Sequence, residues 1–181
     1  RQELEMWIGY YEGMVESAGD LKITLPDIVF SDSLWILGSD RDVKLMEFKD
    51  GHTPSDVVLC IPDERIVFAG DLLFVERHPW MSDGDPASWQ DNLQKLYDDK
   101  YMQTYVPGHG PVCKKDGVKT LYEYFGTMRG LVDSAVDDSV KSALLLQNIP
   151  VKYRRWYFGR FYQNNMKFLM ATRRKDTPVP Q

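Results

Sequence analysis

Three short motifs, each with one side chain that can bind a metal ion, constrain this chain more than any other feature. They are Gly-His-Thr-Pro-Ser-Asp at residues 51–56 with His52, Gly-Asp-Leu-Leu-Phe at residues 70–74 with Asp71, and Pro-Gly-His-Gly at residues 107–110 with His109. Glycine permits tight backbone turns and proline fixes the neighbouring segment, so such motifs can direct a side chain from a strand end into a cleft. Two imidazoles and one carboxylate are ligand types that suit zinc, iron or manganese.

Taken singly, each of these residues also has a simpler interpretation. A histidine beside a glycine is usually a turn residue with a local hydrogen bond, and an aspartate after a strand often caps a turn or a helix. Asp71 is different because it follows residues 66–69, an apolar run that is typical of a buried strand. A carboxylate at that position has to be paired or bound to a metal, since an isolated buried charge is costly. The order and the flanking residues of the three motifs together favour the metal interpretation.

Apolar periodicity predicts strands mainly in the first part of the chain and helices interleaved later. The expected strands are residues 34–37, 43–48, 57–61, 66–69 and 101–106. The expected helices are one from residue 4 to about Gly19, one that begins at Pro86 with Asp85 as its cap, one from Asp116 to about residue 136, one over residues 139–147, and a last one from Pro150 to about Thr172. This order predicts an α/β or α+β fold whose sheet is covered on one face.

Length and composition limit the class of protein. With 181 residues the chain can bury the core of one domain, and no apolar run reaches the length of about 18 residues that a membrane span needs. No secretory signal pattern opens the sequence. Cys60 and Cys113 lie far apart and form neither a metal-type pair nor a disulfide framework. We therefore expect a cytoplasmic protein that does not enter a membrane.

The net charge of −5 is unevenly distributed along the chain. Residues 152–175 contain eight Lys or Arg and no acid, whereas residues 1–151 contain 14 basic and 26 acidic residues, a balance of −12. The basic segment could dock on an acidic surface of the same chain, or it could bind a polyanion. Its interleaved aromatic residues are more typical of packing, and the acidic chain as a whole makes nucleic acid an unexpected partner.

The three motifs together resemble the later ligand motifs of the metallo-β-lactamase-fold hydrolases. The resemblance extends over about residues 20–115 and is closer to the glyoxalase II-like branch, which has an aspartate at the position of Asp71. It implies that residues 1–115 are the C-terminal half of a four-layer αββα sandwich, and that residues 116–181 are extra C-terminal helices packed on the same domain.

The resemblance also implies a role for each candidate residue. His52 would complete a first metal site, His109 a second, and Asp71 would bridge both ions, which makes Asp71 the catalytic candidate. The implied cofactors are two divalent metal ions, zinc first, with iron or manganese as alternatives. A metal-bound hydroxide would then attack an ester, thioester, lactam or phosphoester bond of a small-molecule substrate.

The sequence departs from the family pattern in one respect. The first half of the family's site is a His-x-His-x-Asp-His segment, and this chain does not contain one. Three of about seven ligands cannot hold two ions tightly, so we expect metal binding to be absent or incomplete in this chain. The hypothesis is that the chain is a fragment, inactive alone, that needs a missing N-terminal half in cis or in trans. The alternative is a non-catalytic binding or assembly module, and an exposed apolar face predicts a homodimer in either case.

Residues around the motifs carry weaker expectations. His78 is expected to be a solvated or hydrogen-bonded loop histidine, with contact to substrate as the alternative. Ser55 and Asp56 are candidates for hydrogen bonds near His52. Asp83 is expected in a turn, and Cys113 is expected to be a free thiol without nucleophilic activation.

Overall fold

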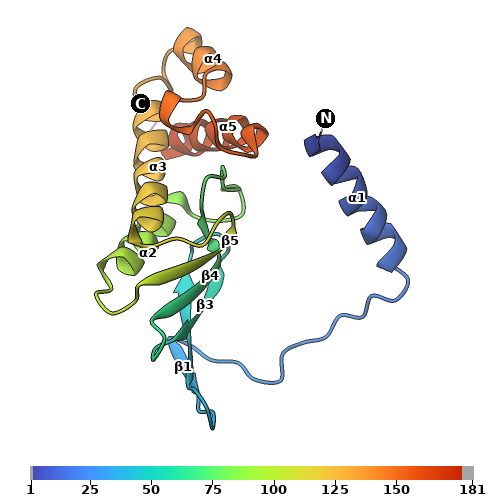
Figure 1. The fold of residues 1–181 in the computed structure, drawn as a ribbon. Coiled ribbons are helices and arrows are strands. Elements are labelled where there is room, and N and C mark those ends of the chain that lie inside the picture. Colours follow the sequence, from blue (N-terminus) through green and yellow to red (C-terminus); the bar gives the residue numbers. More distant parts are fainter. Residues whose placement is uncertain (1, 177–181) are drawn as a thin grey trace. The chain divides into compact units, whose positions relative to one another are not determined.

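The computed structural model describes residues 2–176, and the chain divides into two compact units, Arg1–Phe30 and Ser31–Gln181. The first unit is the helix α1 (Gln2–Ser17) followed by a segment without regular structure (Figure 1). Within α1 the ring of Trp7 stacks on that of Tyr11, with 6.1 Å between ring centroids. The structure confirms the helix expected at the start of the sequence and its end just before Gly19.

A five-stranded sheet forms the centre of the second unit. Its strands are β1 (Ser33–Ile36), β2 (Val43–Lys49), β3 (Ser55–Ile61), β4 (Ile66–Phe74) and β5 (Thr104–His109), and they lie side by side in chain order. The first four strands pair antiparallel, whereas β4 and β5 are parallel. Parallel strands need a crossover connection, and here the helix α2 (Pro86–Asp98) provides it. All five expected strands are present.

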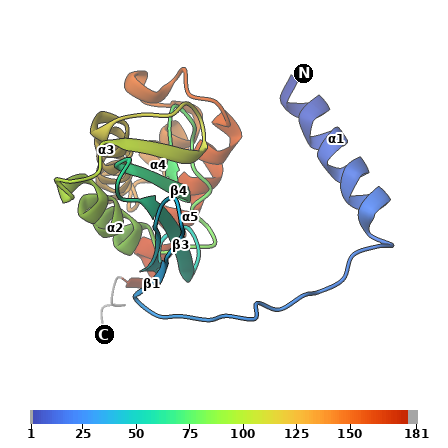
Figure 2. The same ribbon diagram turned by 60° about the horizontal axis from the view of Figure 1, so that its bottom comes forward.

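The helices α2 and α3 (Lys115–Asp133) pack on one face of the sheet (Figure 2). They are followed by α4 (Ser139–Gln147), the short 3₁₀ helix η1 (Val151–Tyr153) and α5 (Gly159–Asp176), and α5 packs on α3 and α4. The core between α2, α3 and the sheet contains the buried side chains of Trp89, Leu93, Leu121 and Phe125. None of the helices in residues 2–176 combines the length and the apolar content that a membrane span requires.

Helix boundaries confirm some expectations and correct others. Asp85 caps α2 as predicted, because its carboxylate accepts a hydrogen bond from the backbone N–H of Ser88 at 2.7 Å. Asp116 does not cap α3: the helix already begins at Lys115, and the Asp116 carboxylate accepts from the N–H of Gly117 instead. The single helix expected after Pro150 is two elements, η1 and α5. Phe158 has φ of 62° just before α5, a left-handed backbone that interrupts a right-handed helix.

The sheet face opposite to α2 and α3 is apolar. One row of side chains crosses all five strands, because the strand register pairs Leu34 with Leu45, Leu45 with Leu59, Leu59 with Phe68 and Phe68 with Val106. The alternate residues Val58, Cys60, Val67 and Tyr105 are buried under the helices. Phe68 is 41% exposed, and its neighbours in the row are half-buried or exposed. We call the five residues of this row, Leu34, Leu45, Leu59, Phe68 and Val106, the open-face row.

Candidate functional site

Asp71 and His109 lie on the two parallel strands of the sheet. Each strand extends further than the apolar pattern predicted, so both residues belong to strands and not to the loops after them. The Nε2 atom of His109 lies 3.5 Å from the Oδ1 atom of Asp71, and the side chains are 45% and 42% exposed. This separation is long for a strong hydrogen bond. Two side chains of types that can bind a metal ion therefore lie together at an accessible place.

Gly108 makes this approach possible. A Cβ atom at this position would collide with the Oδ1 atom of Asp71 and would lie 2.7 Å from the carbonyl carbon of Gly70. Gly70 itself has φ of 54°, and the register between β4 and β5 shifts beside it. The glycines of both motifs are thus needed to bring the two strands close enough for Asp71 to meet His109.

His52 lies in the loop between β2 and β3. Its ring centroid is 5.3 Å from that of Trp89 and 6.1 Å from that of Phe74. Phe74 also stacks on His109, with 4.9 Å between centroids and an interplanar angle of 25°. Phe74 is therefore the common neighbour of both imidazoles, although no direct contact joins His52 to Asp71 or His109 in the described part of the chain.

Hydrogen bonds and close packing hold the His52 loop. The Asp56 carboxylate accepts from the backbone N–H of Thr53 at 3.2 Å and from its hydroxyl at 2.8 Å, as expected for a residue that supports this loop. Ser55 donates its hydroxyl to Glu47 instead, 3.2 Å away. Gly84 lies against the loop so closely that a Cβ atom there would lie 2.7 Å from the carbonyl oxygen of His52. The segment between β4 and α2 therefore fixes the backbone of a candidate ligand.

His78 is a hydrogen-bonded loop histidine, which is one of the two forms expected. The side chain is fully buried, at 0% exposure, and its Nδ1 atom lies 3.0 Å from the hydroxyl oxygen of Tyr124. Burial lowers the pKa of His78 from 6.5 to about 4, and the backbone of Tyr153 offsets only part of that shift. A buried neutral imidazole surrounded by rings cannot reach substrate, so its role is structural.

The remaining candidates have local roles. The indole N–H of Trp80 donates to the Asp83 carboxylate at 3.0 Å, which places Asp83 in a turn. Cys113 is free and half-buried, and burial raises the pKa of its thiol to about 11. A thiol with a raised pKa is a poor nucleophile, as expected.

The candidate residues are of types that bind metal ions, but too few of them lie together to hold an ion. Imidazole and carboxylate are suitable ligands, and Asp71 and His109 lie together. Within residues 2–176, however, the structure contains no group of three or more His, Cys, Asp or Glu that could hold an ion. The described residues thus bring two suitable donor side chains together, fewer than the three or four protein ligands of a typical zinc site.

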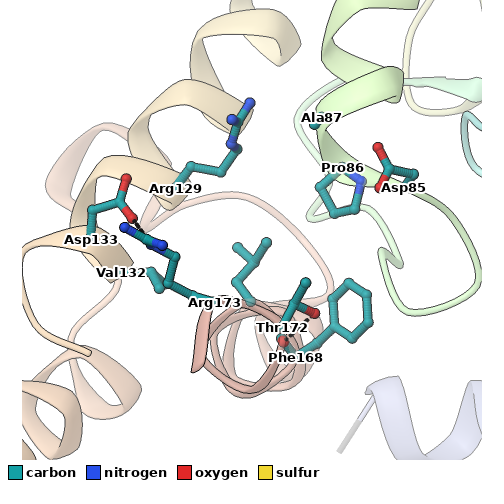
Figure 3. A pocket seen from close by; sticks show the side chains of 10 residues that line it. Asp85, Pro86, Ala87, Arg129, Val132, Asp133, Phe168, Thr172 and Arg173 are labelled. Carbon is teal, nitrogen blue, oxygen red and sulfur yellow. Dashed lines mark hydrogen bonds and ion pairs between the residues drawn. The ribbon is translucent and has the colours of Figure 1, made fainter. Parts of the chain in front are cut away.

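Two hollows lie away from these three residues. One of about 360 Å³ lies between α2, α3 and α5, with the Arg173–Asp133 ion pair on one side and Phe168 and Pro86 on the other (Figure 3). A second hollow, of about 620 Å³, is lined by Phe74, Trp156 and Cys113. His52, Asp71 and His109 line neither.

Aromatic neighbours are the part of the site that sequence analysis missed. Phe74 closes the second motif, and its position there was the available signal, whereas Trp89 was expected only as a core residue of α2. The ring of Phe158 lies 5.8 Å from His109, centroid to centroid, although 49 positions separate the two residues in the sequence. Nothing in the sequence around Phe158 indicates this contact.

Comparison with known proteins identifies the family. The family model of the metallo-beta-lactamase superfamily matches residues 2–117, which is more than half of the chain. The chain therefore belongs to the metallo-beta-lactamase superfamily, as its motifs predicted.

Individual relatives are similar over part of their length. The type 2 metallo-beta-lactamase of Bacteroides fragilis is 27% identical over 100 residues, which are 53% of this chain and 40% of that protein. The structure of a metallo-beta-lactamase from Pontibacter korlensis matches with a TM-score of 0.53 at 24% identity, over 62% of this chain and 54% of the other. The DIM-1 metallo-beta-lactamase structure gives 0.52 at 18% identity, over 61% and 53%. These similarities confirm the mixed α/β fold, and the chain spans about half the length of the relatives it matches.

Proposed function

We propose that this chain contributes metal ligands and one sheet layer to a metal-dependent hydrolase of the glyoxalase II-like branch. The observation that carries the proposal is the convergence of Asp71 and His109 on adjacent strands, where Gly108 removes the side chain that would separate them. Membership of a superfamily of metal-dependent hydrolases supports the same activity. Bond cleavage in an ester, thioester, lactam or phosphoester of a small molecule is the reaction class.

Divalent metal ions, zinc first and iron or manganese as alternatives, supply the Lewis acid and the activated water in such enzymes. The residues of this chain would have simpler roles: His109 and His52 would bind such an ion through imidazole nitrogens, and Asp71 would bind it through its carboxylate. Phe74 and Trp89 pack beside the imidazoles and exclude water from one side of them.

The remaining ligands belong to a part of the protein outside this chain. Two converging donors do not hold an ion tightly, so the proposal requires further ligands from a second half, in cis or in trans. The open-face row gives that half a place to pack, because a two-layer sheet sandwich buries such a surface. By itself the chain is expected to be inactive, and a homodimer through the same face is the other way to cover it.

A second candidate function is a non-catalytic binding or assembly module. The absence of a three-donor group within residues 2–176 favours it for the isolated chain. A longer protein that contains this chain would bind metal ions if it is the hydrolase and would not bind them if it is the assembly module.

Metal content decides between them. Elemental mass spectrometry after removal of loosely bound ions should give close to zero metal for this chain alone. It should give about two ions for a protein that also contains a His-x-His-x-Asp-His half. In that longer protein, Asp71→Asn or His109→Gln should lower the metal content, while Asp83→Asn serves as a matched surface control.

Two results would contradict the proposal. A longer protein that stays metal-free with all ligands present would favour the assembly module. Chelator-sensitive hydrolysis of ester or lactam substrates by the isolated chain would show that it already contains a complete site.

A further inference from the structure

His109 is held between two aromatic rings. Phe74, itself buried, stacks on the imidazole with 4.9 Å between centroids. Phe158 approaches with its ring plane at 87° to that of His109, at 5.8 Å. Stacked and perpendicular arrangements at these separations are the favourable geometries of aromatic pairs. One ring comes from β4, the strand of Asp71, whereas the other comes from the C-terminal helices.

The backbone of Phe158 is in a costly conformation. Its φ of 62° lies in the left-handed region, which a bulky residue rarely adopts because the backbone is strained there. The Phe158 carbonyl accepts the hydrogen bond from the N–H of Phe161, at 2.8 Å, that opens α5. Glycine would adopt this backbone without strain, so the backbone alone would favour glycine here. The phenyl ring is present in spite of that preference.

The residue before Phe158 is joined to the segment that follows β4. The N–H of Tyr157 donates to the carbonyl of Glu76, and the N–H of His78 donates to the carbonyl of Tyr157, both at 3.0 Å. The guanidinium group of Arg77 lies over the Tyr157 ring, 3.9 Å from its centroid. These contacts form a parallel bridge between Arg77 and Tyr157. The bridge fixes the position of Phe158 relative to the end of β4.

His78 packs on the aromatic residues before and after this bridge. It is fully buried, and its ring packs against those of Trp156 and Tyr162, with 5.7 Å and 5.8 Å between centroids. Trp156 precedes the bridge and Tyr162 follows it on α5. The segment that carries Phe158 is thus held on both sides, which is a condition for a strained residue to persist.

From these contacts we propose that Phe158 is a positioning residue for His109. It holds the imidazole against Phe74 in the rotamer that faces Asp71, so the C-terminal helices form one wall of the site. The importance of this wall for metal binding rests on the proposed function, whereas the orientation of His109 does not.

The orientation can be measured without any metal. NMR of the imidazole resonances and the χ1 couplings of His109 is practicable because the chain has three histidines. In the unaltered chain we expect one rotamer. In Phe158→Ala and Phe158→Gly we expect averaging over several rotamers, with Phe158→Gly the more stable of the two in urea because it relieves the positive φ.

Two variants serve as controls. Phe158→Tyr keeps the ring and should restore the single rotamer. Phe168→Ala removes a half-buried ring of α5, the helix that follows Phe158, and should leave the rotamer unchanged while costing stability. A single His109 rotamer in Phe158→Ala and Phe158→Gly would overturn the proposal. If both variants fail to fold, Phe158→Leu, which keeps an apolar side chain, must still show averaging.

Titration with Co²⁺, followed through the His109 resonances, separates this proposal from the proposed function. Loss of one aromatic contact should weaken binding about two- to tenfold in Phe158→Ala. Equal affinity in both proteins would overturn the role of Phe158 at the metal site. A His109 that never responds to Co²⁺ in the unaltered chain would count against His109 as a ligand, and the rotamer measurement would still decide whether Phe158 positions it.

Discussion

At the scale of single residues, His78 shows how burial changes the role of a titratable group. It lies seven positions after Asp71, yet it is turned into an aromatic cluster and bonded to Tyr124. Its Nε2 atom makes no hydrogen bond within the described residues. A proton added there would place an unsolvated charge in the core, so acid should destabilise the fold through this one side chain.

We expect a pH dependence of stability with a definite sign. The pKa of His78 is about 4 in the fold and 6.5 ordinarily, so between these values the unfolded chain binds more protons. The stability that the neutral ring contributes is present above pH 6.5 and is lost as pH falls towards 4, by roughly 3 kcal/mol in total. Urea unfolding across this range should show this loss.

Two variants test the cause. His78→Gln should remove this part of the pH dependence, because glutamine does not titrate. Tyr124→Phe should cost about 1 kcal/mol at every pH and keep the dependence, since burial causes the shift. The same acid destabilisation in His78→Gln would mean that other groups are responsible.

At the scale of elements, β4 and β5 create the candidate site by pairing closely. Their parallel alignment places Phe74 beside His109 in register and carries Asp71 to the same end of the sheet. Basic residues of the C-terminal part pair with acids of α3: Lys152 with Glu123 at 2.6 Å and Arg173 with Asp133 at 2.7 Å. These contacts support the expectation that the basic segment docks on acids of the same chain.

Gly108→Ala should separate the two strands at the site. The new methyl group would collide with Asp71, and overpacking of this kind typically costs about 1–3 kcal/mol. Unfolding in urea should show the loss, and the NMR signals of His109 should show a change in its surroundings. Gly130→Ala is the matched control, because a Cβ atom on that helical residue meets nothing within 4 Å and should stabilise α3 by up to about 1 kcal/mol. A Gly108→Ala variant as stable as the unaltered chain would contradict the close approach.

At the scale of the whole molecule, the described helices of the second unit cover one face of its sheet. The open-face row joins five strands into a continuous apolar surface. Exposed apolar surface of this extent marks an interface in most proteins. The proposed second half and a second copy of the chain compete for it.

Self-association should depend on the open-face row. Light scattering of the isolated chain should give a mass above that of one chain, and Phe68→Lys should lower it, because a charge in the row opposes burial. Leu144→Lys, on an exposed site of α4, is the control and should leave the mass unchanged. A monomer at working concentration in the unaltered chain would count against the dimer.

The sequence by itself determined the order of the elements and the ligand types. The apolar run of β3, the Asp85-Pro86 start of α2 and the three motifs each depend on local chemistry, namely side-chain hydrophobicity, capping and turn geometry. The prediction ended β4 and β5 too early, because the pairing that carries them through Asp71 and His109 involves a partner strand about 40 positions away.

Only the tertiary structure decided which residues surround the candidate ligands. Phe158 reaches His109, and His78 is drawn into the core by Tyr124, through contacts between parts of the chain that local sequence does not relate. Local propensity acts over a few residues, whereas burial and ring packing depend on how distant segments meet. For that reason the motifs predicted a family and three candidate metal ligands, while the contact of Phe158 with His109 became visible only in the folded chain.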